Sequence, residues 1–125
     1  MSTAFPPMQQ IDTASIKREP MEIDPSTVLE GDPKWEMAIF YRNEDNTTVA
    51  GSFLSTPGRF VYESTATEFI TLLSGHVVLT DPDGNSIDAR AGDFIIVEGG
   101  KAYEYDVRET MVDLVVVSGP DPLEY

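Results

Sequence analysis

Among the acidic residues of this sequence, Glu68 is the strongest candidate for a chemical role. Glu68 alternates with Ile70 and Leu72, so in an extended strand its carboxylate shares one face with two aliphatic side chains. If that pair points inward, the carboxylate is buried, which is costly unless it is paired or hydrogen-bonded. Such a group is a candidate general base. A structural role, with the carboxylate bonded to Tyr103 or Arg59, stays open as the alternative.

The only histidine, His76, is the second titratable candidate. Imidazole changes its charge near neutral pH, so His76 is a candidate general base. Its position directly after Gly75, at the start of an expected strand, favours a surface or turn histidine, and we adopt that interpretation. The chain has no cysteine, which excludes disulfides and thiolate zinc sites.

Short strands separated by turn residues must position these side chains. Trp35, Met37, Ile39 and Tyr41 alternate on one face of an extended segment. A turn at 43–46 predicts that residues 47–54 return as a hairpin partner. Further strands are expected at 60–62, 68–73, 76–80, 86–89, 94–97, 102–107 and 111–117. No helical period is sustained, so the sequence predicts an all-β sandwich or closed barrel.

The first 33 residues differ from the rest of the chain. They hold five of the nine prolines and show no sustained period. We expect an extended arm at 1–33 that packs along the domain or across a partner subunit, with a partly disordered tail as the alternative. The barrel is expected at 34–120 and a C-terminal tail at 121–125.

The composition narrows the choice of partners. The chain has 125 residues, with 22 acidic and 8 basic side chains and a net charge of −14. A surface of this charge repels phosphate backbones and anionic lipid, so we expect neither nucleic acid nor membrane as a partner. Residues 1–10 have neither a basic start nor an apolar run, so a cytoplasmic location is expected.

Two glycine-bounded segments carry a resemblance to a known family. The first segment is Glu68-Phe-Ile-Thr-Leu-Leu-Ser-Gly75, and the second is Gly92-Asp-Phe-Ile-Ile-Val-Glu98-Gly-Gly-Lys-Ala-Tyr103. Their spacing resembles the two motifs of the RmlC-like cupin superfamily, with Glu98 in place of a proline and Tyr103 in place of a histidine. The resemblance covers about residues 34–118. It implies a cupin-type double-stranded β-helix, a jelly-roll barrel.

A finer resemblance points to one branch of the cupins. The segment Thr56-Pro-Gly-Arg-Phe60, together with Tyr41 before it, is similar to (S)-ureidoglycine aminohydrolase-like domains. In that branch the position of Phe53 often holds an aromatic pocket residue.

The resemblance also implies a degenerate metal site. Metal-binding cupins use a His-x-His pair, the glutamate of the first motif and the histidine of the second. Here the segment from Tyr62 to Thr67 has no histidine and Tyr103 occupies the later position, so only Glu68 remains in register. A first-row metal needs about three or four nitrogen, sulfur or carboxylate ligands. We therefore expect no metal and no other cofactor.

The remaining candidates are aromatic and polar side chains expected around one cavity. The resemblance places Tyr103 and Tyr105 on the face that lines it. The predicted catalytic residues are Glu68 and Tyr103, and the predicted ligand-binding residues are Phe53, Arg59, Tyr62, Tyr105 and Trp35. An apolar cavity with a few hydroxyl groups is typical of a small-molecule pocket. The alternative for each aromatic residue is ordinary core packing.

Two functions from different classes follow from these residues. The first is a small-molecule-binding cupin, with or without metal-independent acid–base catalysis by Glu68 and a tyrosine. The second is a metal-dependent cupin enzyme acting on a small nitrogen-containing metabolite, with Glu68, His76, Glu63 or Glu98 as ligands. A structural role also stays open, and we expect a homodimer in which sheet edges or the arm pair.

Overall fold

The computed structural model describes residues 5–124, and this part of the chain is built from β-strands without an α-helix. Two short 3-10 helices, η1 (Thr13–Ser15) and η2 (Pro25–Thr27), lie in the first 33 residues. The strands are β1 (Glu19–Met21), β2 (Val28–Gly31), β3 (Trp35–Arg42), β4 (Thr48–Ser55), β5 (Gly58–Ser64), β6 (Thr67–Thr80), β7 (Ser86–Arg90), β8 (Phe94–Val97) and β9 (Lys101–Ser118). The all-β prediction is confirmed.

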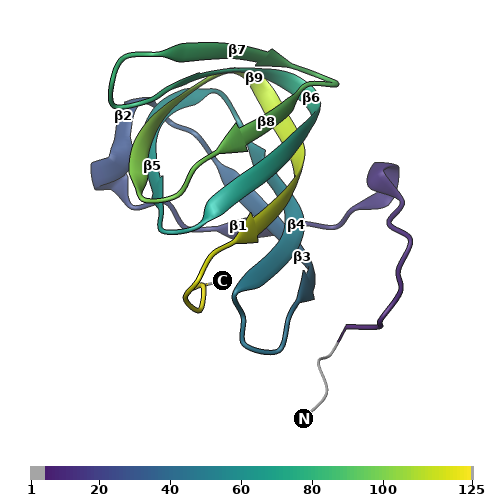
Figure 1. The fold of residues 1–125 in the computed structure, drawn as a ribbon. Coiled ribbons are helices and arrows are strands. Elements are labelled where there is room, and N and C mark those ends of the chain that lie inside the picture. Colours follow the sequence, from purple (N-terminus) through teal and green to yellow (C-terminus); the bar gives the residue numbers. More distant parts are fainter. Residues whose placement is uncertain (1–4, 125) are drawn as a thin grey trace.

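Two long strands, β6 and β9, hold the barrel together. The strand order is β1-β3-β4-β9-β5-β2, and β6 pairs with β7, β8 and β9. Strand β9 pairs along its length with three others, β4, β5 and β6, all antiparallel. Figure 1 shows that this pairing curls the strands around a common interior. The predicted cupin jelly roll is therefore confirmed.

A bend at Gly75 divides β6 into two halves. Gly75 has a φ of 96°, a region that favours glycine, and a Cβ there would run into the backbone oxygen of Thr110. The pairing of β6 with β9 shifts register between Leu72 and Val77, around this glycine. The first half of β6 carries Glu68, and the second half begins with His76.

The predicted hairpin of β3 and β4 is present. The two strands pair antiparallel on either side of the turn at 43–46. A β-bulge between Ile39 and Tyr41 breaks the alternation, since Ile39 pairs with Gly51 but Tyr41 pairs with Ala50. Tyr41 therefore leaves the face of Trp35 and Met37, and it is 38% exposed. The prediction that all four residues share one face is wrong for Tyr41.

The described part of the N-terminal segment packs onto the barrel. Strand β1 pairs with β3, and β2 pairs with β5, so the segment adds a strand at each end of the strand order. Residues 1–4 of the expected arm lie outside the described residues. At the other terminus, the backbone groups of Leu123 exchange hydrogen bonds with Asn46. Both terminal segments thus contact the domain.

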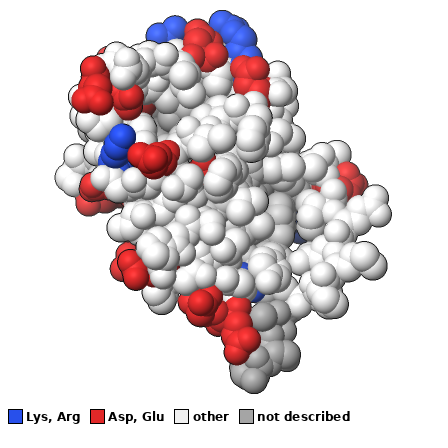
Figure 2. Space-filling view, viewed as in Figure 1, with Lys and Arg blue, Asp and Glu red and all other residues white. Residues whose placement is uncertain are grey.

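The core and the outer surface differ in character. The largest fully buried side chains are Phe60, Leu72 and Met111. On the outer face of the sheet, Phe69 pairs with Ile96 of β8, and Phe94 is 63% exposed. Figure 2 shows charged side chains mainly toward the rim of the visible face, around a largely uncharged centre. No helix among residues 5–124 is long and apolar enough to cross a membrane.

Candidate ligand-binding cavity

One cavity lies inside the barrel, and it combines an apolar wall with two acidic side chains. Its volume is about 60 Å³, enough for a few water molecules or a small organic group. Six strands, β1, β3, β4, β5, β6 and β9, supply the lining residues: Met21, Trp35, Met37, Phe53, Phe60, Tyr62, Glu68, Ile70, Tyr105, Asp113, Val115 and Val117. From β6 only Glu68 and Ile70 contribute, both before the bend at Gly75.

Glu68 is buried in this cavity, as the alternation with Ile70 predicted. Its side chain is 6% exposed, and its Oε2 atom is buried without a hydrogen-bond partner. Burial raises the pKa of Glu68 to about 7, because the apolar surroundings disfavour the charged form. A hydrogen bond from the Tyr62 hydroxyl acts in the opposite direction and lowers the pKa. Glu68 can therefore gain or lose a proton near neutral pH.

A second carboxyl group, Asp113, lies in the same cavity. It is 2% exposed, and its Oδ1 atom accepts a hydrogen bond of 2.9 Å from the backbone N–H of Phe53. Burial, together with the negative charge of Glu68, raises the pKa of Asp113 to about 7. The N–H of Phe53 and the charge of Arg18 act to lower it. The two carboxyl groups are thus electrostatically coupled.

Arg18 approaches this pair without neutralising it. Its Nε donates a hydrogen bond of 3.1 Å to the Ser52 hydroxyl, and that hydroxyl donates to the backbone oxygen of Asp113. Among the residues that the structure describes, neither Glu68 nor Asp113 forms an ion pair. The cavity therefore holds two acidic groups with no basic partner in contact.

Five aromatic rings that line the same cavity contact one another in a continuous series. Trp35 meets Phe53 and Phe60 edge to face, with ring centroids 5.7 Å and 4.9 Å apart. Phe60 stacks on Tyr105 at 5.2 Å, and Tyr105 meets Tyr62 edge to face at 5.9 Å. The Nε1 atom of Trp35 is buried without a hydrogen-bond acceptor. Two residues that line this cavity, Trp35 and Glu68, thus each carry a buried polar atom without a hydrogen-bond partner.

The structure brings most of the predicted site residues together. Glu68, Phe53, Tyr62, Tyr105 and Trp35 all line the cavity. Tyr103 and Arg59 are not among the lining residues.

Tyr103 lies two residues before Tyr105 in β9. Its hydroxyl donates a hydrogen bond of 2.7 Å to the backbone oxygen of Glu98. The alternative in which Tyr103 bonds to Glu68 is therefore wrong, because the Tyr103 hydroxyl donates to the backbone oxygen of Glu98 instead. Tyr62 forms the hydrogen bond to Glu68 instead.

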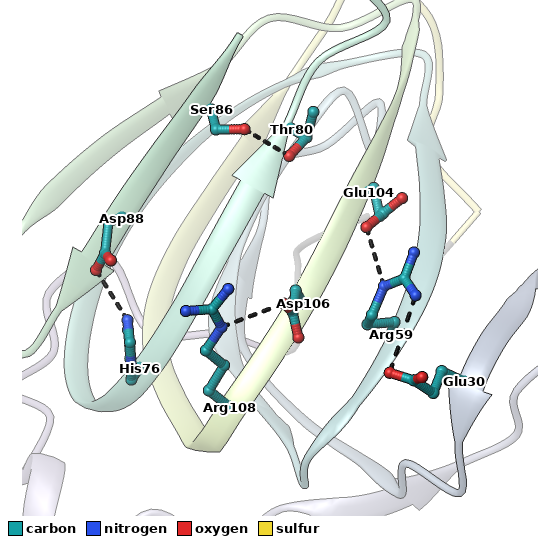
Figure 3. Close-up of polar contacts among 9 residues, drawn as sticks. All are labelled: Glu30, Arg59, His76, Thr80, Ser86, Asp88, Glu104, Asp106 and Arg108. Atoms are coloured by element: carbon teal, nitrogen blue, oxygen red, sulfur yellow. Dashed lines mark hydrogen bonds and ion pairs between the residues drawn. The ribbon is translucent and has the colours of Figure 1, made fainter. Parts of the chain in front are cut away.

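Arg59 points away from the cavity toward two acidic residues. Its Nε lies 3.1 Å from Oε2 of Glu104, and its Nη1 lies 3.9 Å from Oε1 of Glu30 (Figure 3). The alternative in which Arg59 holds Glu68 is also wrong, since the acidic side chains of β9 and β2 hold the guanidinium.

His76 is buried, which corrects the surface interpretation. It is 8% exposed, and its Nε2 lies 2.8 Å from Oδ1 of Asp88 on β7 (Figure 3). Val78 is the register partner of Asp88, so His76 and Asp88 are diagonal neighbours across the strand pair. The histidine follows the bend at Gly75 and does not line the cavity.

The described residues do not fit a cupin metal site. Within residues 5–124 no group of three or more histidine, cysteine, aspartate or glutamate side chains could hold a metal ion. The further ligands that the metal-dependent hypothesis requires are not gathered around Glu68: His76 pairs with Asp88, and Glu98 pairs with Lys101 at 3.5 Å. The cavity offers Glu68 and Asp113 alone as charged ligands.

Sequence reasoning missed Asp113, although a signal for it was present. In Met111-Val-Asp113-Leu-Val115-Val-Val117 the aspartate alternates with three apolar residues, in the same way that Glu68 alternates with Ile70. All four are buried. A lone acidic residue on the apolar face of a long strand is the pattern that would have found it.

Comparison with known proteins supports the fold and the family. The family model of the EutQ-like cupin domain matches residues 42–114. No curated protein matches the chain.

Several solved structures share the fold at low sequence identity. A protein of unknown function from Pseudomonas syringae pv. tomato is 22% identical with a TM-score of 0.75, over 82% of this chain and 45% of its own length. The chain thus spans less than half of that protein. A putative ethanolamine utilization protein Q from Salmonella typhimurium is 17% identical with a TM-score of 0.62, over 83% of this chain and 97% of its own. A predicted oxalate decarboxylase from Thermotoga maritima is 17% identical with a TM-score of 0.65, over 88% and 98%.

Proposed function

The chain belongs to the EutQ-like cupin family, and we propose that it binds a small organic molecule in the barrel cavity through Glu68 and Asp113. In this proposal the two carboxyl groups also exchange a proton with the bound molecule.

One observation carries the proposal: Glu68 is buried in an apolar cavity with an oxygen that has no partner. Buried polar atoms in folded proteins are hydrogen-bonded with few exceptions, and an exception needs an explanation. The unpartnered indole N–H of Trp35 in the same cavity is a second exception. A bound molecule with both a donor and an acceptor would satisfy the two groups at once.

The acid–base part of the proposal follows from the environment of the carboxyl groups. Burial raises the pKa of Glu68 and of Asp113 to about 7. Proton transfer is most efficient when the pKa of the catalytic group lies near the working pH. In its ionised form Glu68 would accept a proton from the ligand and become the neutral acid, and it would return that proton in a later step. Tyr62 would hold the carboxylate in place through its hydrogen bond.

Only the resemblance to a cupin branch narrows the class of substrate. The likeness of Thr56-Pro-Gly-Arg-Phe60 to ureidoglycine aminohydrolase-like cupins stays a prediction, and it would make the ligand a nitrogen-containing metabolite. The metal-dependent form of that enzyme has no observation in its favour, since the described residues do not gather a ligand set around Glu68. No metal-dependent step is therefore part of the proposal.

The experiment uses Trp35 as a reporter, because it is the only tryptophan in the chain. Its indole N–H gives a single signal in a ¹⁵N–¹H NMR spectrum. We would add amines, alcohols, amides and short carboxylic acids one at a time to the full chain. At least one class is expected to shift the Trp35 signal, and Glu68→Gln should weaken that binding at least tenfold.

The matched control is Glu44→Gln, a surface substitution in the exposed turn of the β3–β4 hairpin. It should leave binding unchanged. Two results together would contradict the proposal: binding that moves other signals but not the Trp35 indole signal, and an affinity that Glu68→Gln does not weaken.

A further inference from the structure

We infer that the ligand is a small organic cation, a short primary amine that also carries a hydrogen-bond acceptor, held between Glu68, Asp113 and the aromatic wall. This inference rests on the proposed function and specifies the chemistry of the same site.

The charges in the cavity favour a cation. Glu68 and Asp113 are both buried there, and among residues 5–124 neither forms an ion pair. The nearby guanidinium of Arg18 is directed to the hydroxyl of Ser52. A protonated amine would supply the missing positive charge and three N–H donors, one of them for the unpartnered Oε2 of Glu68. An anionic ligand would instead meet like charge in an apolar site.

The aromatic wall favours a cation for a separate reason. Trp35, Tyr62 and Tyr105 belong to the ring series that lines the cavity. The faces of aromatic rings carry negative potential and attract organic cations, with tryptophan the strongest. Aliphatic side chains would enclose an apolar ligand equally well, so the combination of aromatic rings with two carboxyl groups favours an ammonium group.

The indole of Trp35 indicates that the ligand also carries a hydrogen-bond acceptor. Its Nε1–H is buried without a partner, and an ammonium group cannot accept a hydrogen bond. A ligand that satisfies both ends therefore carries an oxygen, as an ether, hydroxyl or carbonyl, near its amine. A cavity of about 60 Å³ limits such a ligand to a few non-hydrogen atoms.

The inference predicts how binding depends on pH. The titratable or charged groups at the cavity are Glu68 on β6, Asp113 and Tyr105 on β9, Tyr62 on β5, and Arg18 from the N-terminal segment. Burial raises the pKa of both carboxyl groups to about 7. A cation binds the ionised pair, so its affinity rises between pH 6 and pH 8, by about tenfold for each proton that binding displaces. A neutral acceptor ligand binds the protonated pair and shows the opposite trend.

The test compares three probes of nearly the same shape. They are 2-methoxyethylamine, which is a cation, 1-methoxypropane, which is neutral, and methoxyacetate, which is an anion. Each is titrated into the full chain at pH 6 and pH 8, with the Trp35 indole signal as the readout. The amine is expected to bind at least tenfold more tightly than either relative, and more tightly at pH 8 than at pH 6.

Variants and salt separate specific binding from general attraction to an acidic protein. High salt screens the attraction of amines to surface carboxylates but has less effect on a buried site. Glu68→Gln and Asp113→Asn should each reduce the affinity for the amine at least tenfold, whereas Glu44→Gln should leave it unchanged. The two neutralising variants keep the side-chain shape, and the dispersion of their NMR spectra shows whether they fold.

Each outcome bears on a different proposal. If the neutral or the anionic probe binds better, or if affinity for the amine falls from pH 6 to pH 8, the ligand is not a cation, and the proposed function still stands. If the amine binds equally well to both neutralising variants, the carboxyl groups do not hold it and the inference is overturned. If neither these probes nor the wider panel moves the Trp35 signal, the proposed function fails as well.

Discussion

The two halves of β6 treat a buried titratable side chain in opposite ways. Beyond the bend at Gly75, His76 is buried and has a partner in Asp88 at 2.8 Å. Before the bend, Glu68 is buried to a similar extent and leaves one oxygen unpartnered. The same strand therefore contains one satisfied and one unsatisfied polar group.

This difference indicates a structural role for His76 and a ligand-binding role for Glu68. The barrel places an acceptor beside His76 in a region where the side chains of Val77 and Leu79 fill the interior. Around Glu68 the interior is hollow, and a second carboxyl group lies there in place of a basic partner. Unsatisfied buried groups are costly, so their concentration in the cavity marks the place where a ligand would repay the cost.

The largest effect should come from removing packing in the filled half. Leu79→Ala should lower the free energy of unfolding by roughly 2–5 kcal/mol, because Leu79 lies beyond the bend and is buried in the packed core. Ile70→Ala should cost about 2 kcal/mol, near the lower limit for such substitutions, because Ile70 already borders the cavity and loses fewer contacts. Urea unfolding of both variants measures the difference. Equal losses would mean that the cavity half is as tightly packed as the other half.

The next effect concerns the charge on Glu68. Its pKa is raised from 4.5 to about 7 in the folded state, so the folded protein holds this proton more tightly than the unfolded chain. Stability from this group is present at low pH and is lost as the pH rises to about 7. Glu68→Gln removes the buried charge and should stabilise the protein on the order of 3 kcal/mol at pH 8, but less than about 1 kcal/mol at pH 5.

Urea unfolding at the two pH values, with Glu44→Gln as the surface control, measures this change. A Glu68→Gln variant that is less stable than the wild type at pH 8 would show that the carboxylate has a stabilising partner, and the contrast with His76 would disappear.

A smaller effect is expected at the satisfied group. Asp88→Ala removes the hydrogen-bond partner of the buried His76 and should cost about 1–2 kcal/mol of unfolding free energy. Asp88 is itself half exposed, so water can replace part of the lost interaction. Ligand binding in the cavity should not change, because neither residue lines it. A loss of binding without a loss of stability would place the histidine in the functional site.

The smallest effect is expected at Tyr103. Tyr103→Phe removes a hydrogen bond to the backbone oxygen of Glu98 and should cost about 0.5–1 kcal/mol. Ligand affinity, measured with the Trp35 signal, should stay the same. The matched variant Tyr62→Phe removes the hydrogen bond to Glu68 and should raise the pKa of Glu68 further. If Tyr103→Phe reduces ligand affinity as much as Tyr62→Phe does, the placement of Tyr103 outside the site is wrong.

The sequence predicted the fold and one half of the site. Strand alternation was enough to turn Glu68 inward, because Ile70 and Leu72 fix the buried face of β6. The same rule applies to Asp113, but the pairing partners of β9 were needed to show that both carboxyl groups face one cavity. Glu68 and Asp113 are 45 positions apart in the chain, so no local sequence pattern indicates that they line the same cavity.

The errors came from positions where local geometry overrides the pattern. A β-bulge turned Tyr41 off its expected face, and a loop carbonyl took the hydroxyl of Tyr103. His76 was expected at the surface because it follows a glycine, but the bend at Gly75 leads into a strand that β7 covers. Such details depend on register and loop contacts, which the sequence of one chain does not specify.

The most direct test is to measure the protonation of the two carboxyl groups. Side-chain ¹³C signals of Glu68 and Asp113, assigned with Glu68→Gln and Asp113→Asn, would be followed by NMR from pH 4 to pH 9. We predict midpoints near 7 for the pair in the free protein, and a lower midpoint for Asp113 once Glu68 is neutralised, because burial and mutual repulsion both raise the pKa. Midpoints near 4 for both groups would contradict the account, since they would mean that the carboxylates are solvated or paired and the cavity has no need of a ligand.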